Sequence, residues 1–387
     1  MPSQDGMKAV VLAAGVGSRL DPLTRQLPKP MVPFVNRPVM EHIIRLLKRH
    51  GFTRTVSNVH YMHDKVTNFF GTGSSLGVEM DFVYEPTLSG DAGGVRACRD
   101  YIGNSTFLVI MGDLITDLDL SYVVQQHHEK GAVATIALKQ VHEVERFGVV
   151  VLNHDSLITG FQEKPPRKQA KSNLASTGVY VFEPEIFDYI EDKEQVGFGK
   201  DVFPRLVSDK LPVLGVETWG YWSDVGTIEQ YQRSTQDALE GLIDLQLAGD
   251  PFQYGWKQDS ATVGERAHIE GLLQLGHDAH ISDGVRVKGY AVIGDHCLIE
   301  HGSVLENAII WPGTIVGANS HINNSVIGGN CYINKGSRLS RTTVVEPLKR
   351  SERHVLATAN EASYEYAAGE EHPIAAEQLE LDADRHS

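Results

Sequence analysis

The 387-residue chain has few of the features that mark membrane or secreted proteins. No stretch approaches the roughly 18 uncharged apolar residues of a membrane span. Residues 1–6 lack the basic and then apolar pattern of a secretory signal. The three cysteines, Cys98, Cys297 and Cys331, are far apart and include no CxxC pair. This cysteine usage suits a reducing compartment, so we expect a cytoplasmic protein. Because no apolar stretch is long enough to span a bilayer, we expect no membrane partner.

Basic residues are fewer than acidic ones: 35 lysines and arginines stand against 50 aspartates and glutamates, and the formal net charge is -15. Eight acids and one base fall within residues 361–387, so the rest of the chain carries -8. This balance argues against a nucleic-acid partner held by phosphate neutralisation. A small anionic substrate remains compatible with it, since a binding site needs only a few local cations.

The spacing of apolar residues predicts an α/β domain in the first part of the chain. Short apolar runs indicate buried strands at 9–12, 107–111 and 132–138, and residues 55–59 are a further strand candidate. Helical spacing indicates a helix over 39–50. Strands that alternate with helices predict βαβ units, and we expect a Rossmann-like domain with a mixed, mostly parallel sheet over residues 7–245. Ligands bind beyond the carboxyl ends of such strands, where Gly15 and Asp113 fall.

A period of six residues replaces this pattern in the second part of the chain. Aliphatic residues recur from Val263 to Leu305 at intervals of six, and the series resets by five at Ile310 and at Ile327. A hexapeptide period predicts a parallel β-helix, here over residues 263–345 after a linker at 246–262. Solenoid ends and flanks favour self-association, so we expect a homo-oligomer, a dimer or tetramer. Residues 346–387 are expected to form a terminal cap and an acidic, flexible tail.

A glycine-rich segment, residues 12–24, follows the first predicted strand. It is not a P-loop, because no GK[ST] follows, and it lacks the third glycine of the Rossmann fingerprint. Its backbone N–H groups could approach a phosphate, and Arg19 could add a fork of donors. Lys29 stands between two prolines and could stabilise charge on a transferring phosphoryl group. Taken alone, a plain strand-to-helix turn and a solvated loop lysine are the competing interpretations.

Residues 12–33 as a whole resemble the signature of sugar-1-phosphate nucleotidylyltransferases, the NDP-sugar pyrophosphorylases. The family pattern is L-A-A-G-x-G-[ST]-R-L-x-P-L-T-x-x-x-P-K-P-x-x-P, and every defined position is met. The resemblance implies synthesis of NDP-hexose and pyrophosphate from a nucleoside triphosphate and a hexose-1-phosphate, in a chain that ends in a left-handed parallel β-helix. It implies that Arg19 and Lys29 contact the phosphates. The implied nucleotide-holding residues of the loop are Leu12, Ala13, Ala14, Gly15, Gly17 and Ser18.

Two aspartates match the family's metal ligands. Gly112 and Asp113 resemble the strand-end pair whose aspartate binds magnesium, and residues 221–227 resemble [WF]-x-D-[IV]-G-[TS], where Asp224 is the second ligand. Two carboxylates with phosphate oxygens suit Mg²⁺ as the cofactor. For either aspartate alone, a cap or turn would be the more ordinary role.

Three further segments match the family's sugar-phosphate site. Residues 161–165 resemble [FV]-x-E-K-P, which implies that Lys164 binds the sugar's phosphate and Glu163 a sugar hydroxyl. A surface ion pair is the alternative. Residues 147–150 and 172–180 also resemble sugar-contacting segments, and the residues implied there are Gly148, Thr177 and Gly178.

The base-reading loop matches less well. Residues 85–94 resemble it, with Glu85 and Gly90 in nucleotide-binding positions, but Asp91 replaces a small residue of the relatives. A carboxylate there either points away from the triphosphate or reduces activity. Glu85 can only accept hydrogen bonds, and guanine offers two adjacent donors, unless Glu85 faces solvent. We therefore expect GTP and mannose-1-phosphate as substrates, with UTP (or dTTP or ATP) and glucose-1-phosphate as the alternative.

Two other functions stay open at this point. Hexapeptide β-helices also carry acyltransferases that use a histidine base, and six histidines lie in the repeats: His268, His277, His280, His296, His301 and His321. Solvated or inter-coil histidines would be the ordinary interpretation. A non-catalytic paralogue that binds NDP-sugar is the second alternative; the intact Arg19, Lys29 and Asp113 oppose it, and Asp91 keeps it open.

Overall fold

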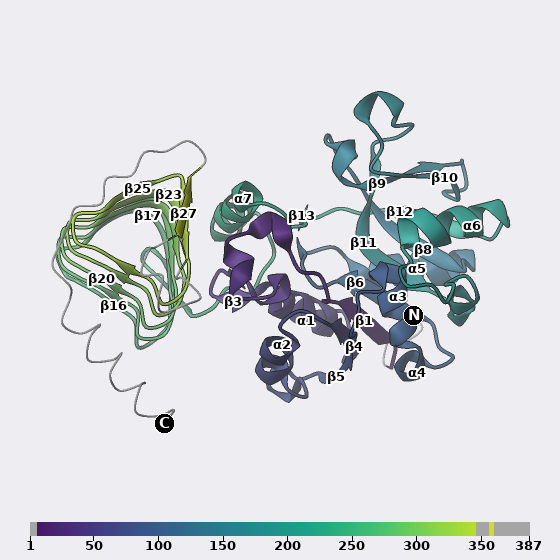
Figure 1. Ribbon diagram of the computed structural model, residues 1–387, viewed down its shortest axis with the longest axis horizontal. Helices are drawn as coiled ribbons and strands as arrows, with labels where there is room; N and C mark the ends of the chain where they lie inside the picture. Colours follow the sequence, from purple (N-terminus) through teal and green to yellow (C-terminus); the bar gives the residue numbers. More distant parts are fainter. Residues whose placement is uncertain (1–5, 346–355, 360–387) are drawn as a thin grey trace. The chain divides into compact units, whose positions relative to one another are not determined.

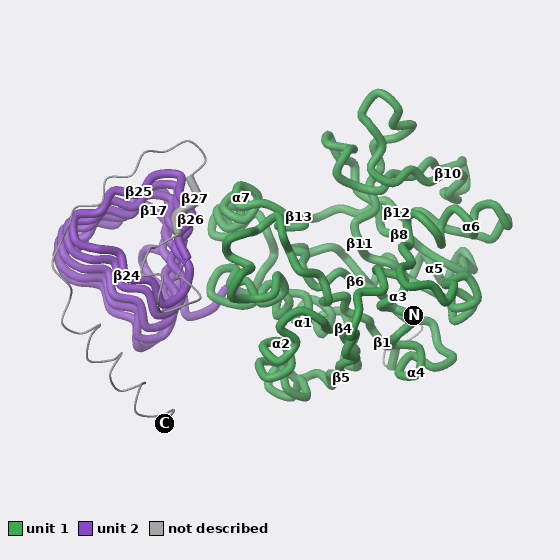
Figure 2. Tube along the Cα trace, viewed as in Figure 1, with its two compact units in different colours: residues 1–246 green, residues 247–387 purple. Residues whose placement is uncertain are grey.

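The structure is a computed structural model that describes residues 6–345 and 356–359. The chain divides into two compact units, Met1–Gln246 and Leu247–Ser387 (Figures 1 and 2). Buried apolar clusters lie within each unit by itself. Within the described part of the chain, none of the helices combines the length and apolar character needed to cross a bilayer.

A nine-stranded sheet forms the centre of the first unit. Four adjacent strands are parallel, in the order β6-β1-β4-β5. They are β1 (Lys8–Leu12), β4 (Arg54–Val59), β5 (Glu79–Tyr84) and β6 (Phe107–Met111). The predicted strands at 9–12, 55–59 and 107–111 are thereby confirmed. The apolar runs of β1 and β6 are what a parallel strand buried on both faces requires, whereas β4 also buries the polar residues Ser57 and Asn58.

The rest of this sheet is mixed. Strand β11 runs antiparallel to β6, β8 and β9, β9 pairs antiparallel with β10, and β12 runs parallel to β8. Their bounds are β8 (Ala134–Gln140), β9 (Gly148–Leu152), β10 (Ile158–Glu163), β11 (Leu174–Phe182) and β12 (Val213–Glu217). The strand predicted at 132–138 is β8, displaced by two residues. The Rossmann-like domain with a mixed sheet is confirmed.

Helices cover both faces of the sheet. One buried cluster joins α1 (Val39–Arg49), α2 (His63–Phe70) and α5 (Leu120–Lys130) to it. The other joins α3 (Gly90–Ala97), α4 (Arg99–Ile102), a π-helical turn at Phe198–Val202 and α6 (Phe203–Ser208). Helix α1 ends one residue before the predicted boundary, with His50 as its C-cap.

Short elements complete the first unit. Strands β2 and β3 form one hairpin, and β7 pairs with β13. The elements are β2 (Pro33–Phe34), β3 (Arg37–Pro38), β7 (Ile115–Thr116), β13 (Trp222–Ser223) and α7 (Ile228–Leu239). Thr227 caps α7 by accepting a hydrogen bond from the Gln230 N–H. This cap places residues 224–226 directly before the helix.

The second unit is rich in short parallel strands. One sheet stacks β16 (Thr262–Val263), β18 (His280–Ile281), β20 (Leu298–Ile299), β22 (Ile315–Val316) and β24 (Tyr332–Ile333). The other contains β14 (Asp250–Phe252), β15 (Gly255–Lys257), β17 (His268–Leu275), β19 (Arg286–Ile293), β21 (Val304–Ile310), β23 (His321–Ile327), β25 (Arg338–Ser340), β26 (Thr342–Val345) and β27 (Leu356–Ala359).

The six-residue aliphatics stack in register between these strands. Val287 pairs with Leu305, and Leu305 pairs with Ile322. All three are buried. Paired positions are therefore 18 or 17 residues apart, and the shorter interval corresponds to the five-residue resets. Of the expected cap and acidic tail at 346–387, only β27 lies within the described residues, and it pairs antiparallel with β26.

Candidate functional site

A cavity of about 480 Å³ lies at the carboxyl ends of the four parallel strands. The loop after β1, Asn58 at the end of β4, Glu85 after β5 and Asp113 after β6 all line it. This is the edge of an α/β sheet where ligands bind, and the volume suits a small molecule. The complete lining is Leu12, Ala13, Ala14, Gly15, Gly17, Ser18, Arg19, Lys29, Pro30, Asn58, Glu85, Leu88, Gly90, Asp91, Met111, Asp113, Gln195 and Gly226.

Lys29 connects three segments at one end of the cavity. Its ammonium group donates to Asp113 Oδ2 at 2.6 Å and to the backbone carbonyl of Asp224 at 2.7 Å. Gly17 makes this approach possible: a Cβ at that position would lie 2.7 Å from the Cβ of Lys29, and its φ of +66° is left-handed. A nearly buried ammonium group is thereby held against the glycine-rich loop, since the Lys29 side chain is only 7% exposed.

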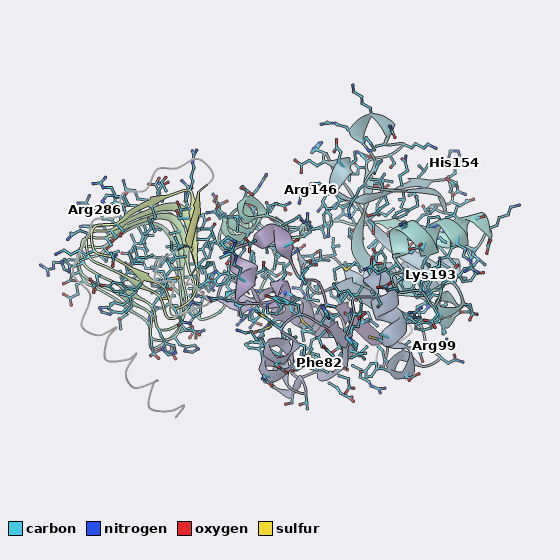
Figure 3. The ribbon with its side chains drawn as sticks, in the orientation of Figure 1. Phe82, Arg99, Arg146, His154, Lys193 and Arg286 are labelled. Atoms are coloured by element: carbon cyan, nitrogen blue, oxygen red, sulfur yellow. The ribbon has the colours of Figure 1, made fainter. Side chains whose placement is uncertain are left out.

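Asp224 lies between two arginines. Its Oδ1 accepts from Arg146 at 3.2 Å, and its Oδ2 is 3.5 Å from Arg19. Arg146, labelled in Figure 3, also donates to Gln230 at 2.6 Å. The next residue, Val225, is fully buried with a left-handed φ of +39°. Such a backbone is strained for a β-branched residue, and strain of this kind concentrates at functional sites.

Another part of the cavity lining is a buried chain of hydrogen bonds. Asn58 accepts from the Ala13 N–H at 2.9 Å and donates to Glu85 Oε1 at 2.6 Å. Glu85 Oε2 accepts from the N–H and the hydroxyl of Ser89. Glu85 therefore does not face solvent, being 5% exposed, and both its oxygens already have internal donors.

Asp91 joins residues 85–94, the expected base-reading loop, to residues 195–202, the segment before α6. Its Oδ1 accepts from the N–H groups of Phe198 and Ala92, both at 2.8 Å. Burial raises the pKa of Asp91, and these two N–H donors oppose that shift. The Asp91 carboxylate therefore faces two backbone donors, and this explains why an aspartate fits at a position where the relatives have a small residue.

The five residues expected to hold the sugar phosphate lie outside that lining. Gly148 on β9 pairs with Glu163 on β10, and Lys164 forms an ion pair with Glu163 at 3.1 Å. The Thr177 hydroxyl donates to the Ala137 carbonyl and is buried. Gly178 packs on Met111, which lines the cavity, because a Cβ there would lie 2.7 Å from Met111 Cγ.

Most of the expected nucleotide-side residues thus meet at one cavity, while Gly112, Asp224 and the five sugar-phosphate residues do not line it. Sequence reasoning missed Asn58, Arg146 and Gln195. Asn58 had a usable signal, since it is the last residue but one of a predicted strand, near the ligand edge of the sheet. Arg146 directly precedes the segment 147–150, which drew attention only to its glycine. Gln195 carried no local signal.

Asp113 and Asp224 have the chemistry of a magnesium site. Both offer carboxylate oxygens, the hard donors that Mg²⁺ prefers, and both contact Lys29, through a carboxylate and a carbonyl oxygen respectively. Their carboxylates are 34% and 16% exposed, so ions and phosphates can reach them. The residues present therefore fit the ion.

None of the six histidines predicted in the repeats, residues 263–345, is among the residues that line this cavity. All six are exposed, and His280 and His296 contact Thr262 and Asp278. Solvated positions or contacts between neighbouring strands account for them.

Comparisons with known proteins agree with this arrangement. Residues 8–241 match the family model described as nucleotidyl transferase, and residues 269–348 match that of the GMPPB C-terminal domain. The chain is 34% identical to a UTP–glucose-1-phosphate uridylyltransferase of Synechocystis, over 85% of this chain and 89% of that protein. It is 32% identical to a mannose-1-phosphate guanylyltransferase of Mycobacterium tuberculosis, over 77% and 82%.

A solved structure is similar as well. It is described as a putative glucose-1-phosphate thymidylyltransferase from Bacillus anthracis in complex with sucrose. The TM-score is 0.54 at 30% identity, and the match covers 59% of this chain and 94% of that one. A Rossmann-like domain with this cavity, together with these relatives, establishes that the chain belongs to the sugar-1-phosphate nucleotidyltransferase family of enzymes.

Proposed function

We propose that this enzyme makes GDP-mannose and pyrophosphate from GTP and mannose-1-phosphate. The observation that carries the proposal is that the glycine-rich loop, Lys29 and Asp113 converge in the lining of one cavity. Backbone N–H groups and a buried ammonium group are suited to bind a phosphate chain. The matches to guanylyltransferases and to the GMPPB C-terminal domain support this nucleotide and sugar.

The reaction needs no general base, because the nucleophile is already ionised at neutral pH. A phosphate oxygen of the hexose-1-phosphate attacks the α-phosphorus in line and forms the new P–O bond. The bond from the α-phosphorus to the bridging oxygen breaks, and pyrophosphate leaves with that electron pair. Positioning and charge stabilisation therefore supply the catalysis.

Lys29 and Arg19 would offset the charge that develops on the leaving pyrophosphate. Leu12, Ala13, Ala14, Gly15, Gly17, Ser18, Gly90 and Gly112 would hold the nucleotide. Asp113 and Asp224 would hold Mg²⁺, which when bound neutralises phosphate oxygens as a Lewis acid. Arg146 would orient the Asp224 carboxylate, which it contacts at 3.2 Å.

The sugar phosphate would lie beside the β9–β10 hairpin. Lys164, with an exposed ammonium group, would bind its phosphate, and Glu163 would accept from a sugar hydroxyl. Gly148 would let the sugar approach the backbone. Since the Thr177 hydroxyl is engaged with Ala137, Thr177 and Gly178 would act through backbone atoms and shape.

A second substrate pair is favoured by two observations. The uridylyltransferase relative has the higher identity of the two described above, 34% against 32%. Both oxygens of Glu85 already accept internal hydrogen bonds, which leaves them less able to read guanine directly. UTP with glucose-1-phosphate is therefore the alternative, and Glu85 would then orient Asn58 and Ser89.

For the second unit we propose a left-handed parallel β-helix. The in-register parallel strands and the stacking of Val287, Leu305 and Ile322 support it. We further propose a homo-oligomer, a dimer or tetramer, which light scattering would test. The three buried, free cysteines are compatible with the expected cytoplasmic location.

Pyrophosphate release, measured for GTP, UTP, dTTP and ATP against mannose- and glucose-1-phosphate, tests the proposal. We expect the highest kcat/KM for GTP with mannose-1-phosphate, and no turnover in EDTA until Mg²⁺ is restored. A preference for UTP with glucose-1-phosphate would select the alternative. Absence of pyrophosphate with every pair would contradict both.

A further inference from the structure

Three metal-ligating side chains gather away from the cavity. His127 and His128 lie in the last turn of α5, and Glu183 directly follows β11. Their candidate ligand atoms all lie within 4.8 Å of one another. Within residues 6–345 and 356–359, this is the one such group of three or more. None of its members lines the cavity or enters the proposed reaction.

Two of these side chains are oriented by neighbouring hydroxyl groups. The His127 ring is completely buried; its Nδ1 faces the Thr135 hydroxyl at 2.8 Å, and its Nε2 faces Glu183 at 3.1 Å. The Thr106 hydroxyl lies 2.9 Å from each oxygen of Glu183. Metal-ligating histidines are usually held in this way, with the second ring nitrogen bonded to a neighbouring polar group.

Access and charge also suit a cation. His128 is exposed and the Glu183 side chain is 31% exposed, so an ion can arrive without opening the core. Among the described residues, no lysine or arginine forms an ion pair with Glu183. The group lies at the carboxyl end of an 11-residue helix, where the helix dipole favours positive charge.

We propose that His127, His128 and Glu183 form a binding site for a divalent transition metal of the Zn²⁺ type. Two imidazoles and one carboxylate are a common zinc ligand set, and water would complete the coordination. The ion would connect the end of α5 to the end of β11. Tetrahedral zinc holds its nitrogen ligands roughly 3.3 Å apart, so His128, the exposed member, would turn inward on binding.

Calorimetric titration of the full chain with ZnCl₂ tests the site, with excess MgCl₂ present to occupy carboxylate sites elsewhere. We expect about one tight equivalent of Zn²⁺ per chain. His128→Ala and Glu183→Gln should each weaken that binding by at least about tenfold. Glu183→Gln keeps an acceptor for Thr106, and His128 is exposed, so both variants should retain the wild-type circular dichroism spectrum.

His154→Ala is the matched control, because His154 is an exposed histidine on another segment, between β9 and β10 (Figure 3). It should bind Zn²⁺ like the wild type. Zinc should also raise the Tm of the wild type and the control but not of the two site variants. No stoichiometric binding, or equal binding by all four proteins, would overturn the proposal.

Discussion

At the scale of single residues, Lys29 brings a nearly buried positive charge to the cavity lining. Replacement by methionine keeps the length of the side chain and removes the cation between Asp113 and the Asp224 carbonyl. We expect Lys29→Met to lower kcat/KM by about 10²–10³-fold, the usual cost of losing a charge-stabilising donor. Pyrophosphate release measures it. Lys48→Met, at an exposed lysine on α1, should leave turnover unchanged.

Asp91 is predicted to act through the backbone that it holds. Asp91→Ala leaves the Phe198 N–H without its acceptor, which should cost about 1–3 kcal/mol in the free energy of unfolding. The KM for the nucleotide should rise, because both Asp91 and Gln195 line the cavity. Asp91→Asn keeps a side-chain oxygen and should be close to wild type. Urea denaturation and steady-state kinetics would show it; equal damage in both variants would point to a need for the charge.

His42 is predicted to make the fold sensitive to acid. Burial lowers the pKa of His42 to about 4, although its hydrogen bond to the Phe34 carbonyl opposes that shift. The unfolded chain takes up this proton near pH 6.5 and the native chain does not. The contribution of the neutral His42 to the free energy of unfolding is therefore full above about pH 6.5. It falls as the pH drops toward 4, by about 3 kcal/mol in total.

The measurement is the unfolding free energy of wild type and His42→Gln at pH 7.5 and pH 5. The unfolded variant cannot take up this proton. The difference in the free energy of unfolding between wild type and variant should therefore shift by about 2 kcal/mol against the wild type from pH 7.5 to pH 5. His154→Gln, at an exposed histidine, should follow the wild type. A constant difference between wild type and His42→Gln would contradict the prediction.

At the scale of elements, residues 85–94 and residues 195–202, the segment before α6, pack closely only because residue 90 is a glycine. Its φ is +82°, and a Cβ there would lie 2.3 Å from the Val196 carbonyl. That carbonyl accepts from Gly93, and the Val196 N–H donates to Ser89. Gly90→Ala must therefore separate the two segments and move Gln195, which lines the cavity.

We expect Gly90→Ala to raise the KM for the nucleotide at least about tenfold and to cost about 1–3 kcal/mol of stability. Gly131→Ala is the control: its φ is +58°, but nothing lies within 4 Å of the added methyl group. It should lose stability of about 1 kcal/mol without a change in KM. Similar KM values for the two variants would show that the docking does not position the site.

The sequence predicts an element well when residues within that element determine it, and poorly when pairing with distant residues does. Strands β1 and β6 are buried on both faces, so their apolar runs alone predicted them, and the ligand edge followed from the expected parallel order. The antiparallel part, β8 to β11, depends on pairings between distant residues such as Tyr180 with Val109, which no local pattern encodes. Gln195 enters the cavity through such contacts, so no sequence pattern could identify it.

At the scale of the whole molecule, the two units have separate buried cores. Every residue that lines the cavity belongs to the first unit, whereas the stacked aliphatics form a cluster of the second. The six-residue period predicted this stack because three repeats span the 18 or 17 residues between paired positions, so every third aliphatic of the series falls beside the same neighbour. Damage to one core should therefore be visible separately from damage to the other.

Leu305→Ala tests that separation, because Leu305 is fully buried between Val287 and Ile322. The cavity left behind should cost about 2–5 kcal/mol in the free energy of unfolding, and the paired strands on either side should share this loss. Scanning calorimetry should show a transition of the second unit at lower temperature, with turnover at 25 °C retained. Lys288→Ala, at an exposed position on β19, should change stability by no more than about 0.5 kcal/mol. Loss of turnover in Leu305→Ala while the first unit stays folded would mean that catalysis depends on the stacked strands.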